Sequence, residues 1–512
     1  MRLGSTRAVA LTGLEGSLVD VEAHIGQGLP HFTVTGLPDT ACAQAPDRVR
    51  SAAALSGYSV PPHRVTVNLS PASIPKSGSG FDLGIAVAVL AAAEAVTSST
   101  VRGIVHIGEL GLDGRIRGVR GVLPAVLAAA RAGVRHVVVP VANAAEAQLV
   151  EGVVVHAAPD LRTLVRWYAA CRDLSDLPVA SPSPGTSGQN RHLGDLADVV
   201  GQSEARHALE LAASGGHHMM LTGPPGVGKT MLAQRLVTIL PPLSRDQALE
   251  VHAIRSLAGL IGEVGELDRT PPFEAPHHSA SVAAIVGGGS GVVLPGAISR
   301  AHAGVLFLDE APEFRPGVLQ TLRQPLESGE VVISRSKQAT MFPARFLLVL
   351  ASNPCPCGRG WGKGLDCLCS AREVRRYTGR LSGPLIDRID IQVSVPPVSR
   401  ASLAEAPGES SAQVASRVSA ARLAQGERWG PHGWQINGQV PGHVLRRHPW
   451  RLPSRATMEV DRALDSGALT LRGYDRVLRV AWSAADLAGL TVPGAEEVTW
   501  AHMLRTHTTR AA

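Results

Sequence analysis

The sequence predicts a multidomain α/β protein with three structured parts. Its 512 residues exceed what one hydrophobic core usually organises, since domains of roughly 150 residues are typical. Residues 180–190 are rich in Ser, Pro and Gly and indicate a linker. Strand-like and helix-like segments alternate on both sides of this linker, whereas only helix-like segments follow residue 397. We therefore expect two α/β parts and a smaller helical part.

Composition supports a globular protein without a membrane segment. Hydrophobic residues make up 45% and charged residues 18% of the chain. The longest apolar run, Leu83 to Ala93, is shorter than the ~20 residues that cross a bilayer. Gly13, Glu15 and Gly16 interrupt the first apolar stretch, which argues against a secretory signal and favours a cytoplasmic protein. The net charge of +6 permits an anionic partner such as nucleic acid.

The first part, residues 1–172, is expected to be an α/β or α+β domain, and residues 173–192 a linker. Asp113 and Gly114 are typical of a hairpin turn. Two strand-like and two helix-like runs carry the α/β pattern: residues 64–69, 134–139, 81–95 and 123–132.

The second part, residues 193–397, contains a phosphate-binding loop that fits G-x-x-x-x-G-K-[ST]. The loop follows the apolar run 219–221 and precedes the helix-like run 231–240, which is the context that this motif requires. Its backbone N–H groups and the positive end of the helix would hold phosphates. Lys229 would neutralise phosphate charge, and the Thr230 hydroxyl would bind Mg²⁺. The predicted ATP-binding residues are Gly223, Pro224, Pro225, Gly226, Val227, Gly228, Lys229 and Thr230.

Two further strands end in polar residues that suit nucleotide hydrolysis. The apolar run 304–308 ends in Asp309, which would hold Mg²⁺ through water, and Glu310, which would orient and polarise the attacking water. The apolar run 346–350 ends near Asn353. That side chain either contacts the γ-phosphate or the water, or forms a turn before the following proline.

The order of these motifs resembles the ComM/YifB family of magnesium-chelatase-like AAA+ ATPases, over essentially the whole chain. The motifs that carry the resemblance are Thr35–Thr40, Val67–Ala72, Gly78–Asp82, Ala275–Ser281, Phe307–Glu310, Asn353–Gly358 and Leu381–Asp390.

This resemblance implies an AAA+ core with a parallel sheet over residues 193–397 and a small helical lid domain over 398–512. Residues 1–172 resemble the Lon protease domain, which has a ribosomal S5 domain 2-like fold. Asp82 and Leu123 stand where that protease has its Ser and Lys, and they cannot form the nucleophilic pair. Peptidase activity is therefore not expected.

By the same resemblance, Asn353 is the sensor-1 residue, Arg388 the arginine finger and Arg472 the sensor-2 arginine. The alternative for both arginines is an ordinary surface salt bridge, and Arg476 and Arg479 lie on the same predicted helix as Arg472. A finger that reaches the ATP of a neighbouring subunit implies a ring of identical chains, a hexamer promoted by nucleotide.

Four of the six cysteines lie close together as two C-x-C pairs, Cys355 with Cys357 and Cys367 with Cys369. Four thiols suit a tetrahedral Zn²⁺ site, although this spacing is tighter than the usual C-x-x-C. Structural zinc, reduced thiols and a redox disulfide all remain open at this point.

Two basic residues in a hairpin-like segment, residues 331–346, are candidates for DNA contact. Arg335 and Lys337 would bind DNA phosphates, or else lie on a solvated turn. His277 and His278 match no metal motif and are interpreted as part of a loop or helix insertion. The resemblance suggests that both segments face a central pore.

The leading functional hypothesis is a hexameric, ATP-driven DNA translocase or branch-migration helicase that acts in recombination or natural transformation. The DNA assignment comes from the resemblance, whereas the motifs themselves indicate ATP and Mg²⁺. The alternatives are a motor subunit of magnesium chelatase and an ATP-dependent unfoldase without peptidase activity.

Overall fold

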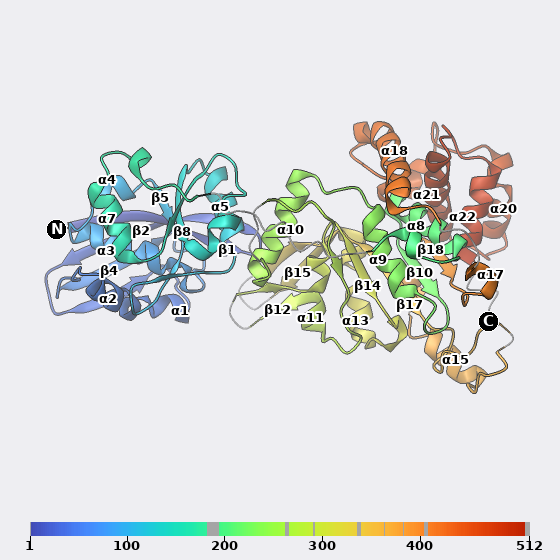
Figure 1. Ribbon diagram of the computed structural model, residues 1–512, viewed down its shortest axis with the longest axis horizontal. Helices are drawn as coiled ribbons and strands as arrows, with labels where there is room; N and C mark the ends of the chain where they lie inside the picture. The colour runs from blue at the N-terminus through green and yellow to red at the C-terminus, as the bar shows by residue number, and fades with distance from the viewer. Residues whose placement is uncertain are drawn as a thin grey trace.

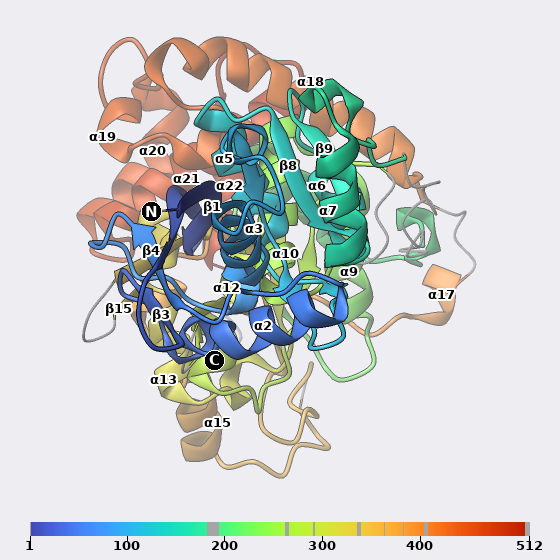
Figure 2. The ribbon, with the colours of Figure 1, turned by 90° about the vertical axis from the view of Figure 1, so that its left-hand side faces the viewer.

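The computed structural model describes residues 2–181, 194–261, 266–289, 292–334, 339–362, 364–381, 383–403 and 408–506. The molecule is elongated, with an N-terminal sheet at one end, a second sheet in the middle and a group of helices at the other end (Figure 1). Figure 2 shows it end-on, with the N-terminal sheet toward the viewer. Among the described helices, none has the length and apolar character needed to cross a membrane.

The N-terminal sheet is mixed, with the strand order β3-β4-β2-β1-β5-β8-β9. Its strands are β1 (Arg2–Thr12), β2 (Glu15–Gly26), β3 (His31–Thr35), β4 (Arg64–Ser70), β5 (Ile104–His106), β8 (His136–Pro140) and β9 (Val154–Ala158). The helices beside it are α2 (Ala45–Leu55), α3 (Asp82–Ala92), α5 (Val122–Arg131) and α7 (Leu161–Ala170). Every residue of α3 is buried, which confirms that the longest apolar run is a core helix.

The predicted turn at Asp113–Gly114 is present between the short antiparallel strands β6 (Glu109–Leu110) and β7 (Ile116–Arg117). Asp82 begins α3 and is fully buried, with its carboxylate paired to Arg48 through two hydrogen bonds of 2.6 and 2.8 Å. Leu123 is buried in α5. Both residues are therefore buried parts of the hydrophobic core.

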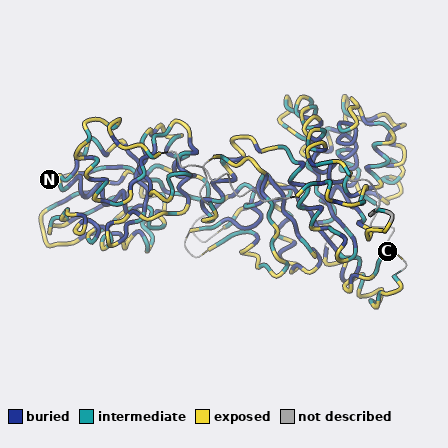
Figure 3. The backbone as a smooth tube through the Cα atoms, in the orientation of Figure 1, coloured by how far each residue is buried: buried dark blue, intermediate teal, exposed yellow. Residues whose placement is uncertain are grey.

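The second sheet is parallel throughout, with the order β11-β14-β17-β10-β18. Its strands are β10 (Met219–Thr222), β11 (Phe273–Glu274), β14 (Val305–Leu308), β17 (Leu347–Ser352) and β18 (Ile391–Ser394). Helices α8 (Ser203–Gly215), α9 (Lys229–Ile239) and α10 (Arg245–Ala258) connect or flank these strands. The predicted parallel α/β core is thus confirmed, and Figure 3 shows its strands as the buried centre of this part.

Two antiparallel hairpins extend from this core. One pairs β12 (Gly287–Gly288) with β13 (Leu294–Pro295), and the other pairs β15 (Glu330–Ser334) with β16 (Ala339–Pro343). The second hairpin is the one predicted from sequence.

The last part is helical over its described residues, 408–506, as the periodicity predicted. Its main helices are α18 (Ser411–Trp429), α20 (Ser454–Asp465), α21 (Leu471–Leu487) and α22 (Ala495–Thr506). The indole of Trp429 is fully buried and lies 4.5 to 6.4 Å, between ring centroids, from those of Trp434, Trp450 and Trp482. These aromatic rings form the centre of the helical core.

The N-terminal part and the parallel sheet are joined through α10, which packs on α5. The Ser256 hydroxyl of α10 donates a 2.5 Å hydrogen bond to the buried carboxylate of Glu146, which also accepts from the backbone of Leu123. The backbone N–H of Gly121 donates to the carbonyl of Ser256. The junction therefore contains buried polar groups that are paired with one another.

Candidate nucleotide-binding site

The predicted phosphate-binding loop lies between β10 and α9, at the carboxyl end of the parallel sheet. Gly226 and Gly228 have φ values of +79° and +89°, in the left-handed region that favours glycine. A Cβ on Gly223 would lie 2.2 Å from the carbonyl oxygen of Val395, so only glycine fits where the loop passes the end of β18. Local sequence thus fixes a backbone that turns its N–H groups toward a phosphate.

The Lys229 ammonium group lies inside this loop. It donates to the carbonyl oxygens of Gly223 and Pro224, at 2.6 and 2.9 Å, and to Oδ1 of Asn353, at 3.0 Å. Burial lowers its pKa, and Asp309 and Glu310 act in the opposite sense. A triphosphate, which carries several negative charges, would relieve this desolvation.

The residues predicted to hold Mg²⁺ are also brought together. The Thr230 hydroxyl donates to Oδ2 of Asp309 over 2.8 Å. A hydroxyl and a carboxylate at this separation, beside a phosphate loop, are the oxygen ligands that Mg²⁺ takes in phosphoryl-transfer sites. The donor set therefore fits the ion.

Glu310 is the second residue after β14 and adopts φ +51°, a conformation that costs a residue with a side chain some energy. Its side chain is about half exposed, at 49%, and one oxygen lies 3.3 Å from Nδ1 of His278. The sequence alone assigns His278 to a loop or helix insertion and does not predict its contact with Glu310. His278 comes from the segment before α11 (Val282–Val286), and no local spacing links it to Glu310.

Asn353 follows β17, the strand next to β10, and its contact with Lys229 places it at the phosphate loop. This is the position expected of a residue that senses the γ-phosphate.

Arg388 lies at the opposite end of the sheet, two residues before Asp390, which precedes β18. Its guanidinium is 11% exposed and pairs with Glu327, and it also donates to the carbonyl of Pro384. Because β10 and β18 are parallel, the residues before β18 lie far from the loop that follows β10. Arg388 therefore cannot serve the nucleotide site of its own chain.

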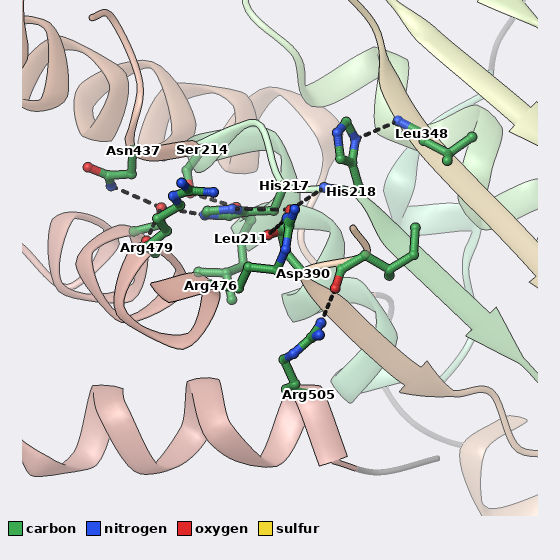
Figure 4. Close-up of polar contacts among 12 residues, drawn as sticks. Leu211, Ser214, His217, His218, Leu348, Asp390, Asn437, Arg476, Arg479 and Arg505 are labelled. Carbon is green, nitrogen blue, oxygen red and sulfur yellow. Dashed lines mark hydrogen bonds and ion pairs between the residues drawn. The ribbon is translucent and has the colours of Figure 1, made fainter. Parts of the chain in front are cut away.

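A buried ionic cluster occupies this same end of the sheet (Figure 4). Asp390 accepts from the backbone of His218 and is paired with Arg476 of α21. Burial alone would raise the pKa of Asp390, but Arg476, His217 and His218 outweigh it and hold that pKa well below its usual value. Burial lowers the pKa of His217 and of His218 to about 4.

This cluster holds the C-terminal helices against the starts of the strands. His217 shares a hydrogen bond of 2.7 Å with Ser483 of α21, and Arg505 of α22 donates to the carbonyl of Ile389. Arg472 is exposed on the first turn of α21, one turn before Arg476. The helices thus pack at the end of the sheet that lies away from the phosphate loop, and not over it.

The four clustered cysteines lie beside the phosphate loop, in the segment that follows Asn353. All four sulfur atoms lie within 4.8 Å of one another, an arrangement that could hold a metal ion. The four residues are Cys355, Cys357, Cys367 and Cys369. The proposed DNA-contact residues, Arg335 and Lys337, lie outside the described residues, between β15 and β16.

A parallel sheet in this order, with a phosphate loop, an Asp-Glu pair and a polar residue after the neighbouring strand, defines a P-loop nucleotide-binding protein of the AAA+ class. Three family models match the chain. "Magnesium chelatase, subunit ChlI" matches residues 195–403, "Subunit ChlI of Mg-chelatase" matches 21–143, and "Magnesium chelatase, subunit ChlI C-terminal" matches 408–505.

Curated relatives match almost the full length. An uncharacterized protein of Mycobacterium tuberculosis (strain ATCC 25618 / H37Rv) is 51% identical, over 97% of each chain. Competence protein ComM of Haemophilus influenzae is 41% identical, over 96% of this chain and 94% of its own. Uncharacterized protein YifB of Escherichia coli (strain K12) is 40% identical, over 95% and 94%. The chain belongs to the ComM/YifB family of magnesium-chelatase-like AAA+ ATPases.

Proposed function

We propose that this chain is an ATPase that assembles into a hexameric ring and moves along DNA as a translocase or branch-migration helicase. Its proposed domains are a Lon-like, non-peptidase domain (1–172), a linker (173–192), the AAA+ core (193–397) and a helical domain (398–512). Its proposed cofactors are ATP and Mg²⁺.

The loop and the polar residues that follow β14 and β17 divide the work of ATP hydrolysis between them. Lys229 and the loop N–H groups would hold the phosphates, and Thr230 and Asp309 would hold Mg²⁺, an ion that supplies positive charge to offset that of the phosphates. Glu310 orients the attacking water and accepts its proton. Asn353 positions the same water or the γ-phosphate.

The observation that carries the ring is the separation of Arg388 from its own phosphate loop. The two lie at opposite ends of one parallel sheet, so an arginine finger at this position can only complete the site of a neighbour. Contact between unlike ends is heterologous and closes into a ring when the rotation permits. Arg472, exposed on α21 at the same end, would act across the same interface.

The DNA assignment is supported by the near full-length similarity to a protein named for competence. Arg335 and Lys337, which lie between β15 and β16 in the sequence, would bind phosphates of the DNA backbone. A magnesium-chelatase motor subunit is the second candidate, because all three matching family models describe that enzyme. An unfoldase is a weaker candidate.

Complementation between two inactive variants tests the shared site. Lys229→Ala removes the phosphate lysine, and Arg388→Ala removes the finger. Neither variant alone should hydrolyse ATP, but a mixture should recover part of the wild-type rate, since Lys229→Ala subunits still donate Arg388 to intact loops. Arg102→Ala, on the exposed surface of the N-terminal part, is the control and should keep the full rate. A mixture as inactive as its components would reject hydrolysis between protomers.

DNA action is tested with the same wild-type protein and single-stranded, forked or four-way-junction DNA. We expect DNA to stimulate ATP hydrolysis. We also expect the protein to convert the four-way junction into two separate duplexes by branch migration. Charge reversal of Arg335 and Lys337 should weaken both effects and leave the basal ATPase rate unchanged. Stimulation only by chelatase partner subunits or by unfolded protein would favour the alternatives.

A further inference from the structure

We propose that Cys355, Cys357, Cys367 and Cys369 form a tetrathiolate Zn²⁺ site that fastens the segment after β17 to the phosphate-binding loop.

The sulfur positions fit a tetrahedral ion. Three Sγ–Sγ separations are 3.4 Å (Cys355–Cys357), 3.6 Å (Cys355–Cys367) and 3.7 Å (Cys357–Cys367), and Cys369 completes the group within 4.8 Å. Sulfurs bound to Zn²⁺ at about 2.3 Å in a tetrahedron lie about 3.8 Å apart, whereas a disulfide requires about 2.05 Å. The three separations are close to those of sulfur ligands around one Zn²⁺ ion, and the 4.8 Å limit leaves Cys369 within reach of the same ion.

The backbone around the cluster is arranged to admit the sulfurs. A Cβ on Gly360 would lie 3.0 Å from Sγ of Cys355 and 3.6 Å from Sγ of Cys367, so glycine allows the chain to pass close to both. The backbone N–H of Gly360 also donates to Sγ of Cys355 over 3.2 Å. Such N–H contacts orient thiolate ligands and offset their negative charge.

The described residues of this segment, 353–362 and 364–370, form no hydrophobic core that could hold it in place. Leu365 and Leu368 are 87% and 91% exposed, and residues 353–362 and 364–370 contain no helix or strand. Figures 1 and 2 show the following helix, α15 (Ala371–Thr378), projecting from the body of the molecule. A loop of this length without secondary structure needs another source of order, and a metal ion supplies it.

The cluster is attached directly to the nucleotide site. Cys355 is buried and stands two residues after Asn353, whose side chain contacts Lys229. Gly358 lies against the loop, because a Cβ there would come within 2.7 Å of Pro225. Loss of the metal would therefore free the segment that presses on the loop and carries Asn353. This coupling rests on the proposed function, whereas the metal site does not.

Metal content of the full chain tests the site itself. Wild-type protein purified with reductant and without added metal should contain about one zinc per chain by inductively coupled plasma mass spectrometry. X-ray absorption should show four sulfur ligands at about 2.3 Å. Cys357→Ser and Cys369→Ser should each lose most of the zinc, and Cys171→Ser, outside the cluster, should keep it. Iron in place of zinc, or a metal-free wild type with four freely alkylated thiols that retains no added Zn²⁺ after desalting, would overturn the assignment.

Nucleotide binding then tests the coupling. Removing zinc with a chelator should weaken binding of a fluorescent ATP analogue several-fold, and Zn²⁺ but not Mg²⁺ should restore it. Zinc-free protein that binds the analogue as tightly as zinc-loaded protein would overturn the coupling. Failure of the proposed function is distinguishable, because a protein that holds zinc but binds no ATP would refute the ATPase and leave the metal site standing.

Discussion

Asp82 of the N-terminal part and Glu310 of the parallel-sheet part are both acids at the end of a regular element, but they differ in burial and in pairing. Asp82 is fully buried, and both of its oxygens accept from Arg48. Glu310 is half exposed, its backbone is in a strained conformation, and one of its carboxylate oxygens lies 3.3 Å from Nδ1 of His278. Removing a fully paired, buried acid destabilises a fold, whereas an acid that is exposed and lies on a strained backbone is available for chemistry.

The largest expected effect on stability comes from breaking the buried pair. Asp82→Ala leaves Arg48 without its partner and should lower the free energy of unfolding by about 3 to 5 kcal/mol. Chemical denaturation of the full chain, followed by circular dichroism, would measure this. Asp20→Ala is the control, because the Asp20 carboxylate is 63% exposed in its pair with Arg7. Equal small losses in both variants would show that Asp82 is not a structural anchor.

The open acid should behave in the opposite way. Glu310→Gln should reduce ATP turnover by about 10²- to 10³-fold, or roughly 3 to 4 kcal/mol in activation free energy, because it removes the base. Nucleotide binding and the unfolding midpoint should stay near wild type. Glu313→Gln, three residues later, provides a control with the same chemical change. A Glu310→Gln protein with normal turnover would reassign the base.

Acidification should act on the buried cluster at the other end of the parallel sheet. Burial lowers the pKa of His217 and His218 from 6.5 to about 4, so the unfolded chain binds more protons between these values. Stability is therefore fully present above pH 6.5 and is lost as the pH falls toward 4. The loss is on the order of 3 kcal/mol per histidine. Melting temperatures across this range should fall less steeply for His217→Asn, and an unchanged slope would contradict the assignment.

The smallest effect is expected at His278. If its contact with Glu310 only orients the carboxylate, His278→Ala should slow ATP turnover several-fold, about 1 kcal/mol, without changing nucleotide affinity. The imidazole of His277 lies against that of His278, with ring centroids 4.1 Å apart, so His277→Ala should have a smaller effect of the same kind. A change in affinity alone would place His278 in binding and not in positioning.

The features that were predicted correctly from the sequence depend on residues that are close together along the chain. The phosphate loop, the Asp309–Glu310 pair and the paired cysteines each depend on spacing that the chain itself fixes. The same holds for the apolar runs that became α3, β14 and β17. The helical periodicity of α18, α20 and α21 was equally local.

The features that were missed are assembled from distant segments. His278 meets Glu310 across 32 positions, and Asp390 gathers partners from before β10 and from α21. No local pattern records such contacts. The sequence could not predict that the C-terminal helices pack at the starts of the strands. That position depends on contacts of Arg476, His217 and Arg505 with residues distant in the sequence.

The junction at Glu146 limits how the molecule can be dissected. A protein severed between residues 181 and 194 would keep every strand of its N-terminal sheet, yet it would lose the Ser256 hydroxyl that the Glu146 carboxylate accepts from inside the interface. Each fragment would then expose to water the surface that α5 and α10 bury against each other in the intact chain. The two parts are therefore best studied as one polypeptide. Aggregation or low stability of either fragment alone would result from the exposed interface and would not show that its own hydrophobic core is unstable.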